Sequence, residues 1–478
     1  MRRISAFVLG IGFVGAALSA VQTAPPKPVF PSYPAPEGSI YTPATGCASA
    51  SCHGGQVVGH KGSEETTWAT SDPHTTAYSV LLNADSKRIA GNLKLGKAHE
   101  AKVCLACHAV DAEKVYHGEL LEGRGRTEGV GCDGCHGPSG KWLSLHYTPA
   151  WKATSDRDKY ERYGFTQTKD FVARSMNCAG CHVGEPGREV NHDLIAAGHP
   201  RLAFEYSRYH YSPRYTKHWV EPLANPAFEM RAWYVGQVST LRAAVSLLEA
   251  RASRADAKPA DHPWPELSES SCYSCHRGLA KSPRAGEVVA PRLAGTLPWQ
   301  TWYSGLADLL PKVHAAMVPG SAVPSLTEFG KLKAVMGKQV INPKDAARAA
   351  ASAGAELDAW LAALQEAQGS NRFASPEPVV LANLLARAAL DESGDKPRDP
   401  DWDFLGQHYL GIAAAFHASG GSAGAPAAWK APLERLRTAL KFPEPSARTR
   451  FDSPVDFDPM AVVTGFQAFR TTTSGGGR

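Results

Sequence analysis

The clearest hydrophobic pattern in the chain is a set of apolar residues that recur at helical spacing. Seven side chains form it: Phe228, Trp233, Val235, Val238, Leu241, Val245 and Leu248. Asn225 followed by Pro226 has the form of a helix N-cap with proline at the first helical position. The breaker-rich residues 258–265 come after the pattern. It therefore predicts one long helix near residues 226–252.

The same cap chemistry recurs in the second half of the chain. Three dipeptides carry it: Asn342-Pro343, Ser375-Pro376 and Asp399-Pro400. Each of them opens an amphipathic run rich in alanine and leucine. These runs predict a helical domain over residues 286–470, followed by a polar, glycine-rich tail at 471–478 that we expect to be disordered.

Residues 39–285 have a different pattern. Apart from the long helix, turn-forming sequence dominates, as in residues 129–138, and long periodic runs are scarce. Such a segment cannot build an ordinary aliphatic core, so it needs other buried apolar material. The predicted fold class is mainly α, with an irregular domain of few helices at 39–285 followed by the helical domain.

The amino terminus has the pattern of an export signal. Met1-Arg2-Arg3 is a short positive segment, and residues 4–20 are apolar and interrupted by glycine. We expect a cleaved signal peptide at 1–24. The alternative is an uncleaved anchor, but 17 residues are at the lower limit for a membrane span. The proline-rich residues 25–38 are typical of an extended tether.

All ten cysteines fall into five pairs, and each pair is followed directly by histidine. The first to fifth motifs are Cys47/Cys52/His53, Cys104/Cys107/His108, Cys132/Cys135/His136, Cys178/Cys181/His182 and Cys272/Cys275/His276. Two such thiols can form thioethers to the vinyl groups of a haem, and the histidine then ligates the iron. Zinc sites, redox pairs and disulfides do not require that histidine. The motifs predict five covalently bound c-type haems.

The first motif is irregular because four residues separate its cysteines instead of two. Two residues must loop out there if both sulfurs are to reach one porphyrin. The histidine rule is kept, so we include this site among the five.

The net charge of the protein indicates which kinds of partner it can bind. The chain has 51 lysines and arginines against 46 aspartates and glutamates, a formal charge of +5. Five haems would add up to about ten propionate carboxylates, so we expect an acidic holoprotein that does not bind nucleic acid. The expected partners are a redox protein donor and a redox protein acceptor in the periplasm, with membrane contact only if the leader stays uncleaved. The oligomeric state is left open.

The order of the motifs and the residues between them resembles the cytochrome c-554 family. The resemblance rests on Trp68-x5-His74-x3-Tyr78, on the glycine-rich residues 129–138 around the third motif, and on a histidine ten residues after His136. It covers about residues 47–182 and implies tetrahaem packing and electron transfer. The Cys-x4-Cys spacing, the fifth motif and the helical domain depart from the family pattern.

The resemblance also implies second axial ligands. His74 would be the distal ligand of the His136 haem, and His146 that of the His53 haem. A haem iron with two histidines is six-coordinate and suited to outer-sphere electron transfer. These two histidines are the strongest distal candidates.

Other histidines are candidates by position alone. His199 and His192 lie shortly after the fourth motif, and one of them, preferably His199, would ligate the fourth or fifth haem. His99, five residues before Cys104, is a further candidate for a neighbouring haem. In the helical domain, His408 is the first histidine to check for the fifth haem.

An open iron would change the function. Family members can keep one haem five-coordinate, and by position that would be the His108 haem. Possible hydrogen-bond donors follow it: Lys114, Tyr116, Arg124 and Arg126. The alternative function is therefore a multihaem oxidoreductase acting on a small nitrogen or sulfur compound. No other catalytic motif is present, so an electron carrier with closely packed haems is the favoured prediction.

Overall fold

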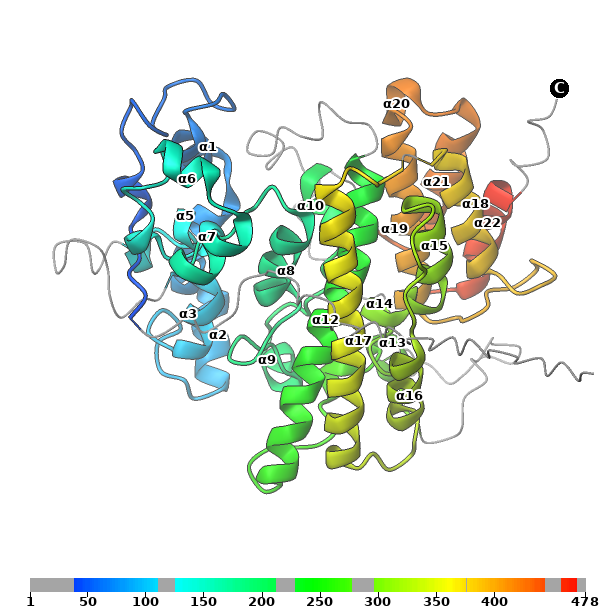
Figure 1. The fold of residues 1–478 in the computed structure, drawn as a ribbon. Coiled ribbons are helices and arrows are strands. Elements are labelled where there is room, and N and C mark those ends of the chain that lie inside the picture. Colours follow the sequence, from blue (N-terminus) through cyan, green and yellow to red (C-terminus); the bar gives the residue numbers. More distant parts are fainter. Residues whose placement is uncertain are drawn as a thin grey trace, which may run out of the picture.

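The computed structural model describes residues 38–110, 125–211, 228–276, 296–374, 376–442 and 457–470. Helices dominate these ranges, and the β-structure in them is limited to isolated bridges. The prediction of a mainly α fold is confirmed (Figure 1). The predicted leader, most of the tether and the tail lie outside the described residues. No helix among the described residues is long and apolar enough to cross a membrane.

Short helices make up the first part of the chain, and they are more numerous than the turn-rich sequence suggested. They are α1 (Glu64–Ser71), α2 (Ala84–Asn92), α3 (Lys102–His108), α5 (Cys132–His136), α6 (Pro149–Ala153), α7 (Asp156–Tyr163), α8 (Phe171–His182), α9 (His192–Ala197) and α10 (Tyr206–Tyr211). Single 3-10 turns lie among them: η1 (Ala44–Gly46), η2 (Pro73–Thr76), η3 (Ser79–Leu82) and η4 (Ser139–Lys141).

The long helix predicted near 226–252 is α12 (Phe228–Ala257), and its predicted first residues lie outside the described ranges. It is buried on most of its sides because α8, α10, α17 and α19 all pack against it. It continues past residue 252 because Arg251 and Arg254 both bind the Glu189 carboxylate, at 3.0 and 2.6 Å. In Figure 1, α12 and α17 run side by side through the middle of the molecule.

The remaining helices surround this pair. They are η5 (Leu267–Glu269), α13 (Cys272–His276), α14 (Thr301–Ser304), η6 (Ala307–Leu309), α15 (Leu310–Met317), α16 (Thr327–Met336), α17 (Pro343–Gly369), α18 (Pro378–Ala389), α19 (Trp402–Ala418), α20 (Gly421–Gly424), α21 (Ala427–Ala439), η7 (Pro459–Val462) and α22 (Val463–Arg470).

Of the predicted caps, Asn342 is in place, and its side chain accepts a hydrogen bond from the Asp345 amide at 3.1 Å. The other two helices begin two residues later than predicted. Glu377 precedes α18, whose first residue is Pro378, and Ser375 itself is outside the described residues. Asp401 caps α19 because its carboxylate accepts from the Asp403 amide.

One continuous apolar core extends from Val172 in α8 to Phe469 in α22 and includes apolar side chains of α12 from Phe228 to Ala252. The described residues of the first part of the chain form two small clusters, one around Leu105 and one around Ile89. The predicted domain boundary near residue 285 is therefore not a boundary of the core. Helix α8, which carries the fourth motif, is packed onto the helical part by its other face.

Candidate haem sites

Four of the five motifs end a helix or a turn at the wall of one cavity of about 2020 Å³. Ligand pockets usually have about 300–1000 Å³, so this cavity has room for more than one large ligand. The first four motifs contribute both cysteines and the histidine to its lining. His74, His146, His199 and His210 line it as well.

Helix ends present the regular motifs. Helices α3, α5, α8 and α13 all end at the histidine of the second, third, fourth and fifth motif respectively. In a helix, residues three and four positions apart lie on one face, so both thiols and the imidazole of a Cys-x-x-Cys-His motif point to the same side. This is the arrangement that one porphyrin edge and its iron require.

The first motif reaches the same arrangement by a turn. The amides of Cys52 and Gly54 both donate to the Ser49 carbonyl, at 2.8 and 3.0 Å, which loops out the extra residues. A Cβ atom at Gly54 would lie 1.9 Å from the Ala48 carbonyl oxygen, so only glycine fits there. Cys47, Cys52 and His53 still line the cavity together.

The fifth motif departs from the expectation of five closely packed sites. Cys272, Cys275 and His276 do not line the cavity, and Cys275 and His276 are exposed, whereas Cys272 is half-buried. The reason lies in α13, which packs by Tyr273: this residue is 4% exposed, and its hydroxyl donates to the Phe457 carbonyl at 3.1 Å. Cys275 follows two positions later and so projects from the opposite side of the helix. Cys275 therefore lies apart from the first four motifs, and its attachment to a haem stays a prediction.

Three pairs of imidazole rings face each other across the cavity. The ring centroids are 6.2 Å apart for His53 and His146, 6.1 Å for His74 and His182, and 6.4 Å for His108 and His199. With a metal–nitrogen bond of about 2 Å on each side, as for zinc, and about 1.1 Å from nitrogen to ring centre, a metal between two imidazoles sets these centres roughly 6.2 Å apart. The spacing suits one iron per pair.

Hydrogen bonds orient five of these six rings in the same way. Nδ1 lies 2.8 Å from Glu64 Oε2 in His53, 2.8 Å from Asp72 Oδ1 in His74, 2.8 Å from Ala77 O in His108, 2.6 Å from Leu143 O in His146 and 2.7 Å from Pro200 O in His199. Carbonyl and carboxylate oxygens accept, so Nδ1 carries the proton and Nε2 keeps its lone pair for a metal. The residues present therefore fit haem.

Burial keeps the rings of His108 and His182 neutral, which a ligand must be. Burial, with the nearby charges of His74 and His108, lowers the pKa of His182 to about 3, and burial lowers that of His108. His74 differs: burial opposes its protonation, but the hydrogen bond and charge of Asp72 raise its pKa above 6.5. A carboxylate at Nδ1 makes a histidine a stronger donor to a metal.

The glycine-rich sequence before the third motif holds the turn that carries His74. Gly129 has a φ of +83°, and a Cβ atom there would lie 2.3 Å from the His74 carbonyl oxygen. The next amide, of Val130, donates to that same oxygen at 3.1 Å. Gly129 is therefore needed for the close approach of two segments that meet at the cavity.

Asp133, inside the third motif, connects chain segments that lie before and after that motif. Its buried carboxylate accepts from the Thr42 amide at 2.7 Å and from the Ser139 amide and hydroxyl at 3.0 and 2.8 Å. Burial raises its pKa to about 6, and these hydrogen bonds oppose that rise. The site thus depends on residues before and after the motif.

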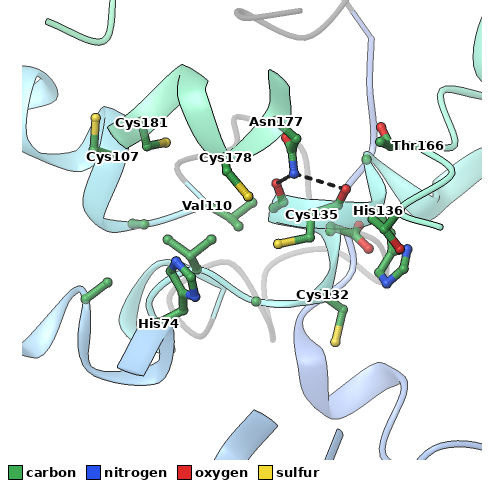
Figure 2. Close-up of a pocket in the computed structure, with 18 of the residues that line it drawn as sticks. His74, Cys107, Val110, Cys132, Cys135, His136, Thr166, Asn177, Cys178 and Cys181 are labelled. Carbon is green, nitrogen blue, oxygen red and sulfur yellow. Dashed lines mark hydrogen bonds between the residues drawn. The ribbon is translucent and has the colours of Figure 1, made fainter. Parts of the chain in front are cut away.

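The motifs do not follow one another in space as they do in the chain. The Cys47 thiol is within hydrogen-bonding reach of Cys132, and that of Cys107 within reach of Cys181. Asn177, just before the fourth motif, donates to the Cys135 carbonyl at 3.2 Å (Figure 2). The order of sites is therefore His53, His136, His182, His108, which we name the four-site row.

Several sequence-based assignments differ from the structure. His74 was expected opposite His136, but it faces His182, and His136 stacks on Phe165 with centroids 5.9 Å apart. His199 was expected near the fourth or fifth haem, but it faces His108, the site at which the alternative hypothesis placed an open iron. These pairings depend on how the chain folds back on α3 and η2. Of the suggested donors, Lys114, Tyr116 and Arg124 lie outside the described residues.

The other candidates lie off the cavity. His99 packs against Tyr78, and its Nε2 is 3.7 Å from Glu100. The His192 amide donates to Glu266 Oε1 at 2.9 Å, close to the start of the fifth motif. His408 is buried on α19, and its Nδ1 donates to the Phe404 carbonyl at 2.8 Å.

His210 is the cavity residue that sequence reasoning missed. It is 3% exposed, lines the cavity, and donates from Nδ1 to the Tyr206 carbonyl at 2.9 Å. Burial and the charge of Arg174 lower its pKa to about 3. No signal in the sequence marks it as a cavity residue, because it is a single histidine in an aromatic segment, residues 206–211, that carries no motif.

The cavity, its thiol pairs and its imidazoles fit covalently attached haem, the cofactor of the electron-transferring c-type cytochromes. Residues 47–137 match the family described as cytochrome c554 and c-prime, which makes this part of the chain cytochrome c554-like. The match includes the first three motifs. No curated protein and no solved structure matches the chain.

Proposed function

We propose that the protein is an exported pentahaem cytochrome that carries electrons between two redox proteins in the periplasm. A haem held by two histidines supplies a one-electron iron couple that changes little in geometry on reduction. The chain supplies the attachment thiols, the axial imidazoles and the apolar wall that excludes water from them. The catalytic alternative, an oxidoreductase with one open haem, is an outcome of the test below.

The observation that carries this proposal is the set of three facing histidine pairs in one cavity. We assign His53 with His146, His74 with His182, and His108 with His199 as axial pairs. His136 is the axial ligand of its own site, and His276 that of the fifth. The assignment rests on ring spacing and on the Nδ1 hydrogen bonds rather than on sequence position.

The closeness of sites in the four-site row favours transfer of electrons from haem to haem over storage of electrons at isolated haems. Neighbouring motifs lie close enough for their thiols to interact at two of the three steps, and Asn177 links the third and fourth motifs. Electrons entering at the His53 end would reach the His108 end through His136 and His182. The partners bind at the ends of this row.

The proposal is tested by haem content and spin state. We expect five haems per chain by absorption and a low-spin electron paramagnetic resonance spectrum for the paired sites. Replacing His146 by alanine should convert one haem to high spin, whereas the same change at the exposed His60 should convert none. A low-spin spectrum in H146A that equals the wild type would refute this pairing.

Two further outcomes would change the proposal. A high-spin signal in the wild type that shifts on adding nitric oxide or hydroxylamine would favour the oxidoreductase. Amino-terminal sequencing of the mature protein from a periplasmic fraction should start after the predicted leader, residues 1–24. Retention of Met1 there would contradict a cleaved signal.

A further inference from the structure

The fifth motif lies apart from the cavity but is tied to it by one buried ion pair. Arg201 lines the cavity, and its guanidinium makes a two-pronged contact with Asp403 of α19, at 2.9 and 3.1 Å. The Arg201 and Asp403 side chains are 12% and 3% exposed. Thr301 donates a third hydrogen bond to Asp403 Oδ2 at 2.8 Å.

On the cavity side, Arg201 belongs to a short segment that touches two sites of the row. His199 faces His108, and Phe204 stacks on His182 with centroids 5.1 Å apart. The Tyr303 hydroxyl donates to the Leu202 carbonyl, and the Trp302 indole donates to that of Phe204, both at 3.0 Å. The segment that holds Arg201 is thus fixed on both sides.

On the other side, the start of α19 is bonded to the fifth motif. Asp401, two residues before Asp403, accepts from the Ser271 hydroxyl at 2.5 Å and from the Ser274 hydroxyl at 3.3 Å. These serines flank Cys272. The charge of Arg201 also acts on the Cys272 thiol: burial raises the pKa of that thiol, and Arg201 opposes the rise. Arg201 is therefore linked through Asp403 and the adjoining Asp401 to the serines beside Cys272.

We propose that Arg201 is a positioning residue that joins the fifth haem site to the His108 end of the four-site row and sets the reduction potential of that site. The inference rests on the proposed function, since it needs a fifth haem. It extends the row into the helical part of the chain and makes α19 one wall of the fifth site. Electrons would pass between the row and the fifth site at this end.

The sign of the effect follows from charge. A positive group near a haem favours its reduced form, and a negative group disfavours it. R201Q removes the cation and keeps the Asp403 carboxylate, so it should lower the potential of the fifth haem. D403N removes the carboxylate and keeps the cation, so it should raise that potential. If Arg201 and Asp403 had a role in folding alone, the two variants would not shift the potential of the fifth haem in opposite directions.

The experiment is a spectroelectrochemical titration of the full haem-loaded protein. The fifth component is identified as the one missing from C272S/C275S. We expect at least a tenfold change in its ratio of reduced to oxidised haem at fixed potential, about 59 mV for one electron. R201K, which keeps the charge, should stay close to the wild type.

The Arg242–Asp358 pair is the matched control. It joins α12 and α17 with the same two-pronged contact, at 2.7 and 3.0 Å, and neither residue lines the cavity. R242Q and D358N should leave all potentials unchanged. The proposal is overturned if R201Q and D403N leave the potentials unchanged or shift them in the same direction.

Two outcomes separate this inference from the proposed function. If C272S/C275S contains as many haems per chain as the wild type, the fifth haem does not exist and both proposals fail. If five haems are present and only the potential test fails, the pentahaem cytochrome stands without a role for Arg201. If R201Q does not mature, D403N alone tests the proposal. An upward shift in the potential of the fifth haem supports it, and no shift overturns it.

Discussion

The hydrogen bond at Nδ1 is the smallest feature that prepares a candidate ligand for a metal. His53 and His74 bond to carboxylates, and His108, His146 and His199 to carbonyls. Each bond fixes the tautomer and the ring orientation, so Nε2 remains available to iron without reorganisation. His210 and His408 have the same bond. A buried histidine on a helix can satisfy its Nδ1 proton in this way without binding a metal.

Replacing Asp72 by asparagine should weaken His74 as a ligand. Asp72 accepts from both the amide and Nδ1 of His74, and its charge raises the pKa of that ring. Less electron donation to the ferric iron should raise the potential of one haem, by roughly 60 mV for each tenfold loss of relative ferric affinity. A redox titration checks this, and a fall in potential would contradict it.

At the scale of elements, helix ends carry the attachment chemistry and other helices position it. Helix α8 ends at His182 on the cavity, while its other face packs on α12, where the Ser175 and Ser239 hydroxyls lie 2.6 Å apart. Helix α19 brings Asp401 and Asp403 to the fifth motif and buries His408 one to two turns further on. Packing therefore couples the helical part to two attachment sites.

Protonation of His408 should make the helical part less stable in acid. Burial, aided by the charge of Arg398, lowers the pKa of His408 from 6.5 to about 4. The unfolded chain therefore binds this proton first, and stability is lost as the pH falls from 6.5 toward 4. The loss should reach about 2–3 kcal/mol.

Urea unfolding at neutral and acidic pH, followed by circular dichroism, measures this loss. H408Q should flatten the pH dependence, whereas H60Q, at an exposed histidine, should leave it unchanged. An equal pH dependence in H408Q and wild type would show that His408 is not the responsible group.

The whole molecule contains two kinds of interior. Residues from Val172 to Phe469 bury a continuous apolar core of their own, centred on α12 and α17. The first part of the chain surrounds a large cavity and has only small apolar clusters. Its compactness should therefore depend on the haems that fill the cavity, because an empty apolar space forfeits packing contacts.

Preventing haem attachment should accordingly unfold the two parts unequally. In a chain with all ten cysteines replaced by serine, hydrogen exchange read by mass spectrometry should be fast in residues 38–165. Peptides from α12, α17 and α19 should stay protected, as in the haem-loaded protein. Equal protection of both parts would contradict this view.

Much of this architecture could be predicted from the chain alone. The long helix, the Asn342 cap and the mainly α class follow from spacing and cap chemistry, which are local. The attachment motifs are equally local: in four of the five, cysteines three apart and the next histidine lie on one face wherever a helix forms. The resemblance to the cytochrome c-554 family likewise rests on short motifs.

The surroundings of each motif were not predictable in this way. The fifth motif has the same local pattern as the second, third and fourth, yet Cys275 is exposed and lies off the cavity. Burial of Tyr273 against Phe457, 184 positions away in the chain, turns this thiol outward. A contact over that separation leaves no trace in the spacing of the motif.

The pairings were decided by the tertiary structure. His74 meets His182, His199 meets His108, and Arg201 meets Asp403 because segments separated by up to about two hundred residues fold onto one another. The close approach at Gly129 and the place of α8 in the helical core depend on the same long-range packing. The sequence by itself determined which groups can hold haem. Only the fold decided which of them face each other, since facing is a property of distance in space and not of position in the chain.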